Sequence, residues 1–123
     1  PPRSTPLLLA TYYGFEGITK ALLDCEQDMN AQDGSGNTAL MGVCFKGFQN
    51  IAKLLIDKGA DVNVTNYNGA TALIFAATFN RIELVQLLLE NGADSEVRDD
   101  RGNRALEHAE MQGASAIVTL LSS

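Results

Sequence analysis

The chain contains one histidine, His108, and it lies between two glutamates in a pattern that invites a chemical interpretation. Glu107 and Glu110 could join it as metal ligands or as partners in acid–base catalysis. Either role needs further ligands or a positioned partner, and the neighbouring sequence supplies none. The better interpretation is a polar helix, so we expect no catalytic residue, no metal, no cofactor and no enzymatic activity.

A glycine pattern near residue 34 loosely matches a dinucleotide-binding fingerprint. Gly34-x-Gly36-x-x-Ala39 has the spacing, but it follows Gln32-Asp33, where the fingerprint requires a buried strand. Equivalent places later in the chain read Asn68-Gly69 and Arg101-Gly102, so a glycine recurs there without the fingerprint. The segment is therefore expected to be a turn.

Asn63-Val64-Thr65 matches the sequence that accepts N-linked glycans. Asn30 occupies the equivalent place in an earlier, related segment, which lacks the serine or threonine needed for glycosylation. A shared asparagine without a shared glycosylation sequence indicates a structural role, and we expect Asn63 to have one.

These motifs lie within a unit that the chain repeats several times. The copy at residues 66–98 begins with a turn, continues with an apolar segment, breaks at Asn80 and adds a second apolar segment. The second segment spaces its apolar residues by three and four, as an amphipathic helix does, and Gly92 follows as a helix stop. Several residues recur at a constant spacing: Leu7, Leu40, Leu73 and Leu106; Gly36, Gly69 and Gly102; Asp28, Asp61 and Asp94.

A turn followed by two helices, with a period of about 33 residues, resembles the ankyrin repeat. The resemblance implies an all-α fold, an α-solenoid of stacked helix-turn-helix units with projecting turns or short β-hairpins, whose inner helices line a concave groove. We expect a single domain over residues 1–123, with repeats at about 1–32 (partial), 33–65, 66–98 and 99–123 (resembling a C-terminal cap). The motifs that carry the resemblance are Thr5-Pro6-Leu7, Thr38-Ala39-Leu40 and Thr71-Ala72-Leu73, with Gly59-Ala60-Asp61 and Gly92-Ala93-Asp94.

The two terminal repeats depart from this pattern. In the first, Leu7-Leu8-Leu9 offers more apolar surface than an end repeat should show to water, which indicates a missing upstream segment, a cap or a contact with another molecule. Glu26 stands where later repeats have Gly59 and Gly92, so this helix end is expected to close differently. In the fourth repeat Arg104 replaces the capping threonine, and polar residues accumulate as a cap requires.

Charge and hydropathy restrict the classes of partner. The chain has 9 basic and 15 acidic residues, a net charge of −6, which argues against binding to the phosphates of nucleic acid. No apolar run approaches the roughly 20 residues that a membrane span needs, so no membrane insertion is expected. We expect a monomer that binds a protein partner.

The two cysteines bear on the compartment. Cys44 falls at a small position where inner helices approach closely, and Cys25 at the exposed end of an outer helix, so no disulfide is expected. A reducing, cytoplasmic environment is favoured. The chain begins Pro-Pro-Arg without methionine, as a processed or trimmed form does, which leaves an exported or periplasmic location open.

Candidate partner-binding residues follow from the resemblance, which implies that two consecutive positions at the end of each inner helix face the partner. Five of these eight are aromatic or methionine, the residue types that anchor interfaces, although any single ring could fold back over a helix end. The turns would add a polar rim that includes Asp33 and Asp99. The candidates are Tyr12, Tyr13, Phe45, Lys46, Thr78, Phe79, Met111 and Gln112 on the helices, and Tyr67, Asn68, Asp100 and Arg101 on the turns.

The predicted function is therefore a non-enzymatic protein–protein interaction module. Two alternatives stay open. One is an inhibitor or immunity-type protein that occludes a partner enzyme, and the other is a structural segment of a longer ankyrin array. Their sequence support differs, since the groove chemistry suits the first and Leu7-Leu8-Leu9 favours the second.

Overall fold

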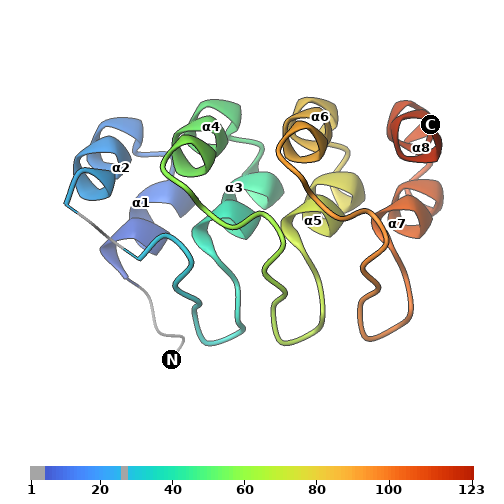
Figure 1. The fold of residues 1–123 in the computed structure, drawn as a ribbon, viewed down its shortest axis with the longest axis horizontal. Coiled ribbons are helices and arrows are strands. Elements are labelled where there is room, and N and C mark those ends of the chain that lie inside the picture. Colours follow the sequence, from blue (N-terminus) through green and yellow to red (C-terminus); the bar gives the residue numbers. More distant parts are fainter. Residues whose placement is uncertain (1–4, 26–27) are drawn as a thin grey trace.

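A stack of four helical hairpins makes up the computed structural model, which describes residues 5–25 and 28–123. One helix of each hairpin belongs to an inner row and the other to an outer row (Figure 1). The inner helices are α1 (Pro6–Tyr12), α3 (Ala39–Lys46), α5 (Ala72–Thr78) and α7 (Ala105–Met111). The outer helices are α2 (Glu16–Leu23), α4 (Gln49–Asp57), α6 (Ile82–Glu90) and α8 (Ser115–Ser122). This is the predicted helical solenoid.

Threonine starts three of the four inner helices, as the repeat pattern predicts. The hydroxyls of Thr5, Thr38 and Thr71 accept hydrogen bonds at 3.1, 3.3 and 3.2 Å from the backbone N–H three residues on. Such a cap satisfies one of the N–H groups that a helix start leaves free. In α7 the capping is reversed, because the Glu107 carboxylate accepts from the Arg104 backbone N–H at 2.8 Å.

The predicted helix ends are confirmed where the structure describes them. Gly92 follows α6 with a φ of 88°, the left-handed conformation that closes a helix and that glycine adopts without strain. The irregular end predicted for the first outer helix falls on Glu26, which lies outside the described residues. Cys25 is exposed and Cys44 is buried, both with free thiols, as their places in the repeat predict.

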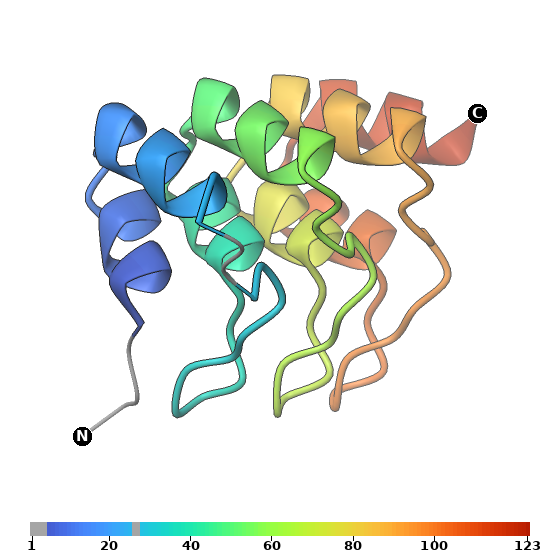
Figure 2. The same ribbon diagram turned by 60° about the vertical axis from the view of Figure 1, so that its left-hand side comes forward.

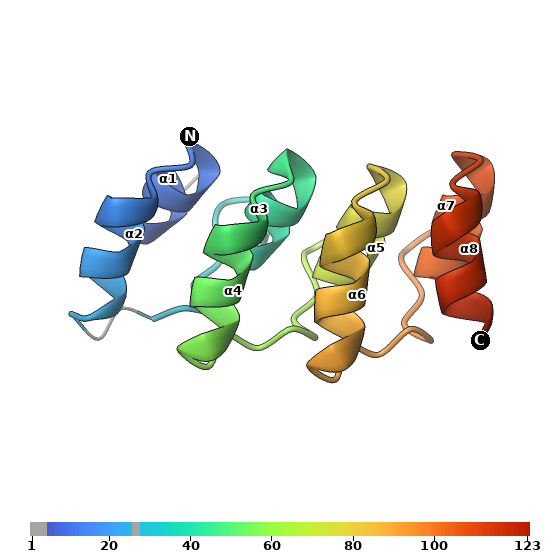
Figure 3. The ribbon, with the colours of Figure 1, turned by 90° about the horizontal axis from the view of Figure 1, so that it is seen from above.

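The core runs through the stack between neighbouring hairpins. Each inner helix packs on the next inner helix and each outer helix on the next outer helix, as the view from above shows (Figure 3). Small side chains at one repeated position allow close approach of the inner row, with Ala10, Val43, Ala76 and Ala109 all buried. Leucines at a second repeated position fill the space between hairpins, and Leu7, Leu40 and Leu73 are buried.

The loops between hairpins project to one side as fingers (Figure 2). In each finger one side-chain oxygen accepts two backbone N–H groups, which closes the turn: Asp33 binds Ser35 and Asn37, Asn66 binds Asn68 and Ala70, and Asp99 binds Arg101 and Asn103. Adjacent fingers are joined by the backbone bonds Tyr67 N to Ser35 O and Asp100 N to Asn68 O. The fingers are turns, and within residues 5–25 and 28–123 none of the short β-hairpins allowed by the prediction has formed strands.

Two smaller predictions about loops are also confirmed. Gly36 lies in a turn with a φ of 82°, and a Cβ there would lie 2.7 Å from the Tyr67 ring of the next finger, so both conformation and space require glycine. Asn63 is structural, since its Oδ1 accepts from Asp94 N at 2.8 Å and its Nδ2 donates to Gly92 O at 3.0 Å.

The apolar surface of the first repeat differs from the prediction for Leu7-Leu8-Leu9. Leu7 is buried because it packs in the core toward α3, and only Leu9 is half exposed. Outside this leucine segment, the exposed apolar groups of the hairpin include Phe15 and Ile18, on or beside α2. None of the helices in the described part of the chain is long and apolar enough to cross a membrane.

Candidate functional site

Four aromatic rings form a continuous row across three inner helices, at the helix ends farthest from the fingers. Tyr13 meets Tyr12 edge to face with centroids 5.3 Å apart, and Tyr12 stacks on Phe45 at 6.5 Å. Phe45 in turn meets Phe79 edge to face at 4.7 Å. We call Tyr13, Tyr12, Phe45 and Phe79 the aromatic row. Tyr12 and Tyr13 belong to the first hairpin, and Phe45 and Phe79 to the next two, so the stacking of hairpins brings the rings into contact.

The rings of the aromatic row are not folded away under the helix ends. Relative exposures are 60% for Tyr13, 39% for Tyr12, 37% for Phe45 and 40% for Phe79. Edge-to-face and offset contacts between rings are favourable, by about 0.5–1.5 kcal/mol each beyond area burial. The contacts therefore hold the rings in place while leaving a large apolar surface in water.

The other predicted helix residues border this row. Lys46 lies beside it with Nζ 4.6 Å from the centre of the Tyr12 ring, a cation–π contact. The Thr78 hydroxyl donates to the Ile74 carbonyl at 2.7 Å, so its proton is used within its own helix. Met111 and Gln112 occupy the equivalent places at the end of α7, and both are exposed.

The predicted finger residues form a separate exposed set. Tyr67, Asn68, Asp100 and Arg101 lie in the turns that precede the inner helices, whereas the aromatic row lies at the other ends of those helices. Tyr67 also has a structural contact, because its ring lies against Gly36 of the preceding finger. The structure thus brings together the four rings and Lys46, and leaves the finger residues apart from them.

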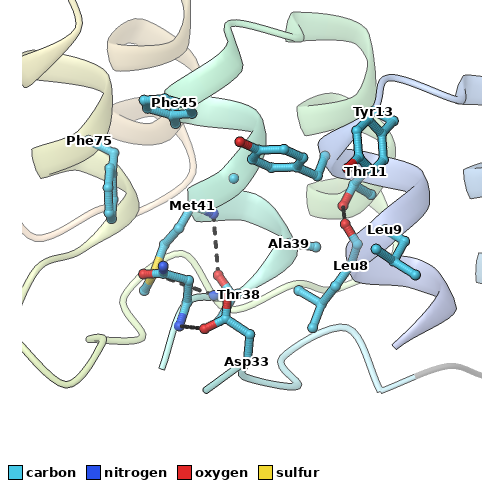
Figure 4. A pocket seen from close by; sticks show the side chains of 13 residues that line it. Leu8, Leu9, Thr11, Tyr13, Asp33, Thr38, Ala39, Met41, Phe45 and Phe75 are labelled. Carbon is cyan, nitrogen blue, oxygen red and sulfur yellow. Dashed lines mark hydrogen bonds between the residues drawn. The ribbon is translucent and has the colours of Figure 1, made fainter. Parts of the chain in front are cut away.

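A pocket of about 470 Å³ connects the base of the finger that contains Asp33 with the aromatic row. It lies over α3, with α1 on one side and Phe75 of α5 on the other (Figure 4). Its walls are mainly apolar, and Asp33 supplies the charged group of the lining. The lining comprises Leu8, Leu9, Thr11, Tyr12, Tyr13, Asp33, Asn37, Thr38, Ala39, Met41, Gly42, Phe45 and Phe75.

Several of these pocket residues were not among the sequence candidates. Gly42 and Phe75 occupy one position of the repeat, one helical turn before the predicted partner-facing residues, and Leu9 and His108 occupy it in the first and fourth repeats. Residues three apart on a helix share a face, so the repeat alignment already places this position beside the aromatic row. The residue at this position changes from leucine to glycine, phenylalanine and histidine in successive repeats, and this variation is the sequence signal that marks the position.

In the fourth repeat the equivalent surface is occupied by polar side chains that pair with one another. Arg104 donates to both carboxylate oxygens of Glu107, at 2.9 and 2.6 Å, and its Nη1 lies 3.2 Å from a Glu96 oxygen. The hydrogen bonds from Arg104 to Glu107 lower the pKa of Glu107 to about 2, and the same pairing raises the pKa of Arg104. The helix around His108 is therefore polar, as predicted, and Arg104 and Glu107 form an ion pair at its start.

His108 pairs with Asp99, the aspartate that closes the finger of the fourth repeat. Its Nε2 lies 2.7 Å from Asp99 Oδ2, while Asp99 Oδ1 accepts the N–H groups of Arg101 and Asn103. Burial raises the pKa of Asp99, but the hydrogen bonds from Asn103, His108 and Arg101 outweigh it, so that the net pKa is lowered. Among the residues that the structure describes, no three His, Cys, Asp or Glu side chains converge as a metal site.

Comparison with known families gives two matches. Residues 2–66 match a family model described as ankyrin repeats (3 copies), and residues 55–109 match one described as ankyrin repeats (many copies). A search of curated proteins found no match. The two matches overlap and together cover both the aromatic row and the pocket.

Proposed function

This chain belongs to the ankyrin repeat family, whose repeats are generally modules of protein–protein interaction, and we propose that it binds a protein partner along its inner-helix surface. The aromatic row supplies the anchors, and the exposed finger residues supply a polar rim. The module acts without catalysis of its own. Contact area and shape hold the partner, and the finger charges tune its choice and its rate of association.

One observation carries the proposal, namely the exposure of four rings that touch one another. Tyrosine and phenylalanine are enriched in the central, desolvated parts of interfaces, and a few such residues contribute most of the binding free energy. Rings already held by their neighbours lose little conformational entropy when a partner covers them. Contiguous exposed apolar surface of this kind marks interaction sites.

The length of the aromatic row limits the shape of the partner. Neighbouring packed helices lie about 8–10 Å apart, so a row across three inner helices extends over roughly 20 Å. Lys46 lies beside the row, and Asp33 lies at the finger side of the pocket next to it. A partner element that crosses the inner helices and presents alternating apolar groups fits this arrangement.

The experiment that tests the proposal uses the whole chain and a partner captured from its native source. Tyr13→Ala combined with Phe79→Ala should weaken binding at least about tenfold, which is a loss of about 1.4 kcal/mol. Ile18→Ala is the matched control, because Ile18 is an exposed apolar residue outside the aromatic row. Circular dichroism should show the same helical content in all variants. An unchanged affinity with an intact fold would contradict the proposal.

An assay of the captured partner separates two forms of the function. If the partner is an enzyme and the chain blocks its activity in proportion to occupancy, the module is an inhibitor of the immunity type. If activity persists in the complex, the module is a scaffold or adaptor. The double variant is expected to lose inhibition and binding together.

A second role, as a segment of a longer ankyrin array, has its own support. Ile18 is 55% exposed, whereas Ile51, Leu84 and Ile117 at the same repeat position are 3%, 2% and 0% exposed. In those three repeats the preceding hairpin covers the side chain. Determination of the complete reading frame tests this role, since further units of the same length before residue 1 would support it and an unrelated preceding segment would contradict it.

A further inference from the structure

The second and fourth repeats have an aspartate at the same point of the finger, but the two aspartates have different hydrogen-bond partners. Asp33 and Asp99 are two repeat lengths apart, and so are Gly42 and His108. In the fourth repeat the His108 imidazole reaches the second carboxylate oxygen of Asp99 at 2.7 Å. In the second repeat the residue at the place of His108 is a glycine, which has no side chain to offer.

Consequently, within the described part of the chain, only one of the two oxygens of the Asp33 carboxylate accepts hydrogen bonds. Its Oδ1 accepts the N–H groups of Ser35 and Asn37, each at 2.9 Å, as Asp99 Oδ1 does in its own finger. No residue in the described ranges donates to Oδ2 or forms an ion pair with Asp33. The side chain is partly buried in the lining of the pocket. A partly buried carboxylate oxygen gains more from a donor than one in open water.

The rest of the pocket has room and suitable walls for the missing donor. A Cβ added at Gly42 would meet only Tyr12 Cδ1, at 3.7 Å, so the space over the glycine is open. The Phe45 and Phe75 rings line the surrounding walls, together with Tyr12, whose ring already has the Lys46 ammonium 4.6 Å from its centre. The faces of such rings attract cations, and the flat guanidinium group stacks on them. A volume of about 470 Å³ lies within the range of about 300–1,000 Å³ typical of ligand pockets.

We propose that this pocket receives an arginine side chain of the protein partner, whose guanidinium pairs with Asp33 Oδ2 while its stem lies over Gly42 among the rings. The inference rests on the proposed function and names the partner's anchor residue. Charge complementarity favours it, since the chain carries a net charge of −6 and Asp33 is the charged residue of the lining. The Asp99–His108 pair shows that the same scaffold position takes a nitrogen donor.

Two small probes test the pocket directly. Nα-acetyl-arginine amide should shift the backbone amide resonances of Asp33, Ala39 and Gly42 in ¹H–¹⁵N spectra at millimolar concentrations. The citrulline analogue has nearly the same shape without the charge, and should bind at least about fivefold more weakly because it loses the charge-assisted bond. Equal binding of the two analogues, or stronger binding of Nα-acetyl-leucine amide, would overturn the arginine assignment.

Variants of Asp33 and Gly42 give independent evidence. Asp33→Asn should remove the preference for arginine over citrulline, whereas Asp57→Asn, at an exposed aspartate of the outer helix α4 outside the pocket, should keep it. Gly42→His should reproduce the Asp99–His108 arrangement and prevent arginine from binding while the fold stays intact. An arginine preference that survives in either Asp33→Asn or Gly42→His would contradict the proposal.

Failure of this inference can be told apart from failure of the proposed function. Phe79 belongs to the aromatic row but not to the pocket lining, so Phe79→Ala should weaken the captured partner and leave the arginine probe unaffected. Partner binding that depends on Phe79 but not on Asp33 would remove the arginine anchor and keep the groove. Partner binding that depends on neither residue would remove both.

Discussion

The first and fourth hairpins form opposite ends of the described stack, and equivalent residues in them have opposite surroundings. Ile18 is exposed on α2, whereas Ile117, at the same repeat position in α8, is fully buried. This position faces the preceding hairpin, and α8 has α6 to pack on. Leu7 and Leu106 differ in the reverse sense, because that position faces the following hairpin and only Leu7 is fully covered.

The two ends of the stack also differ in their polar groups. The fourth repeat fills its inner-helix surface with Arg104, Glu107 and His108, which are paired with one another or with the finger. The first and second repeats leave Leu9 and Gly42 at the place of His108, and a pocket opens there. In a stack of equivalent units, a residue is buried only where a neighbouring hairpin covers it. At the repeat position of Gly42 and His108, the size of the side chain determines whether the inner-helix surface contains a pocket.

The largest effect is expected for the buried member of the isoleucine pair. Ile117→Ala should lower the free energy of unfolding by about 2–5 kcal/mol, because it removes buried methyl groups and leaves a cavity between α6 and α8. Ile18→Ala should cost less than about 1 kcal/mol, as exposed substitutions usually do. Urea unfolding of both variants measures the difference. Equal losses would mean that Ile18 is covered in solution, and the contrast between the two ends would fail.

Substitutions at the N-cap position of the inner helices should show a smaller difference in the free energy of unfolding between repeats. Thr71→Ala removes the hydroxyl that caps α5, and the expected cost is about 0.5–2 kcal/mol. Arg104→Ala should cost less, because the backbone N–H at residue 104 is bound by the Glu107 side chain, which the variant keeps. Thermal unfolding of the two variants compares them. A larger loss for Arg104→Ala would show that the ion pairs, and not the cap, hold the start of α7.

The fold could be predicted from the sequence because its determinants are local and repeated. Thr38 caps the helix that follows it, Gly92 closes the helix before it and Asn63 binds the next loop, each as its place in the unit predicts. The exposure of Ile18 could not be predicted in the same way. Its residue type matches Ile117, and only the presence or absence of a neighbouring hairpin separates them.

The candidate site could be predicted only in part. The repeat identified Tyr12, Phe45 and Phe79 one at a time, but their mutual contacts depend on how the hairpins are rotated in the stack. The pocket was missed because its central feature is Gly42, a residue that marks a site by leaving space. Such a space becomes visible only when the walls on α1 and α5 are in place.

Glycine at position 42 keeps the pocket open, but it should also lower the stability of α3. Gly42→Ala is expected to raise the free energy of unfolding by about 0.5–1 kcal/mol, because alanine orders a helix at lower entropic cost and the new Cβ meets nothing closer than 3.7 Å. Gly17→Ala in α2 is the matched control, since a Cβ there has nothing within 4 Å. Both variants should be stabilised to a similar degree in urea unfolding. A destabilised Gly42→Ala variant would mean that the pocket floor has no room for a side chain.

The last contrast is a distinctive pH dependence of stability, which is expected from the polar network of the fourth repeat. The bonds from Arg104 hold the pKa of Glu107 at about 2, below its ordinary value of 4.5, so the unfolded chain binds more protons between these limits. Glu107 therefore contributes its full stability above pH 4.5 and loses it as the pH falls toward 2. Glu107→Gln should flatten the loss of stability in this window, whereas Glu110→Gln, at an exposed residue of the same helix, should keep the wild-type slope. Urea unfolding measured at intervals from pH 7 to pH 2.5 compares the slopes, and equal slopes for Glu107→Gln and wild type would show that the carboxylate is not held by Arg104.

Asp99 also has a lowered pKa, so it should add to the loss of stability at the lower end of this pH window. A slope that remains in Glu107→Gln and disappears when Asp99→Asn is added would assign the remaining loss to the finger of the fourth repeat.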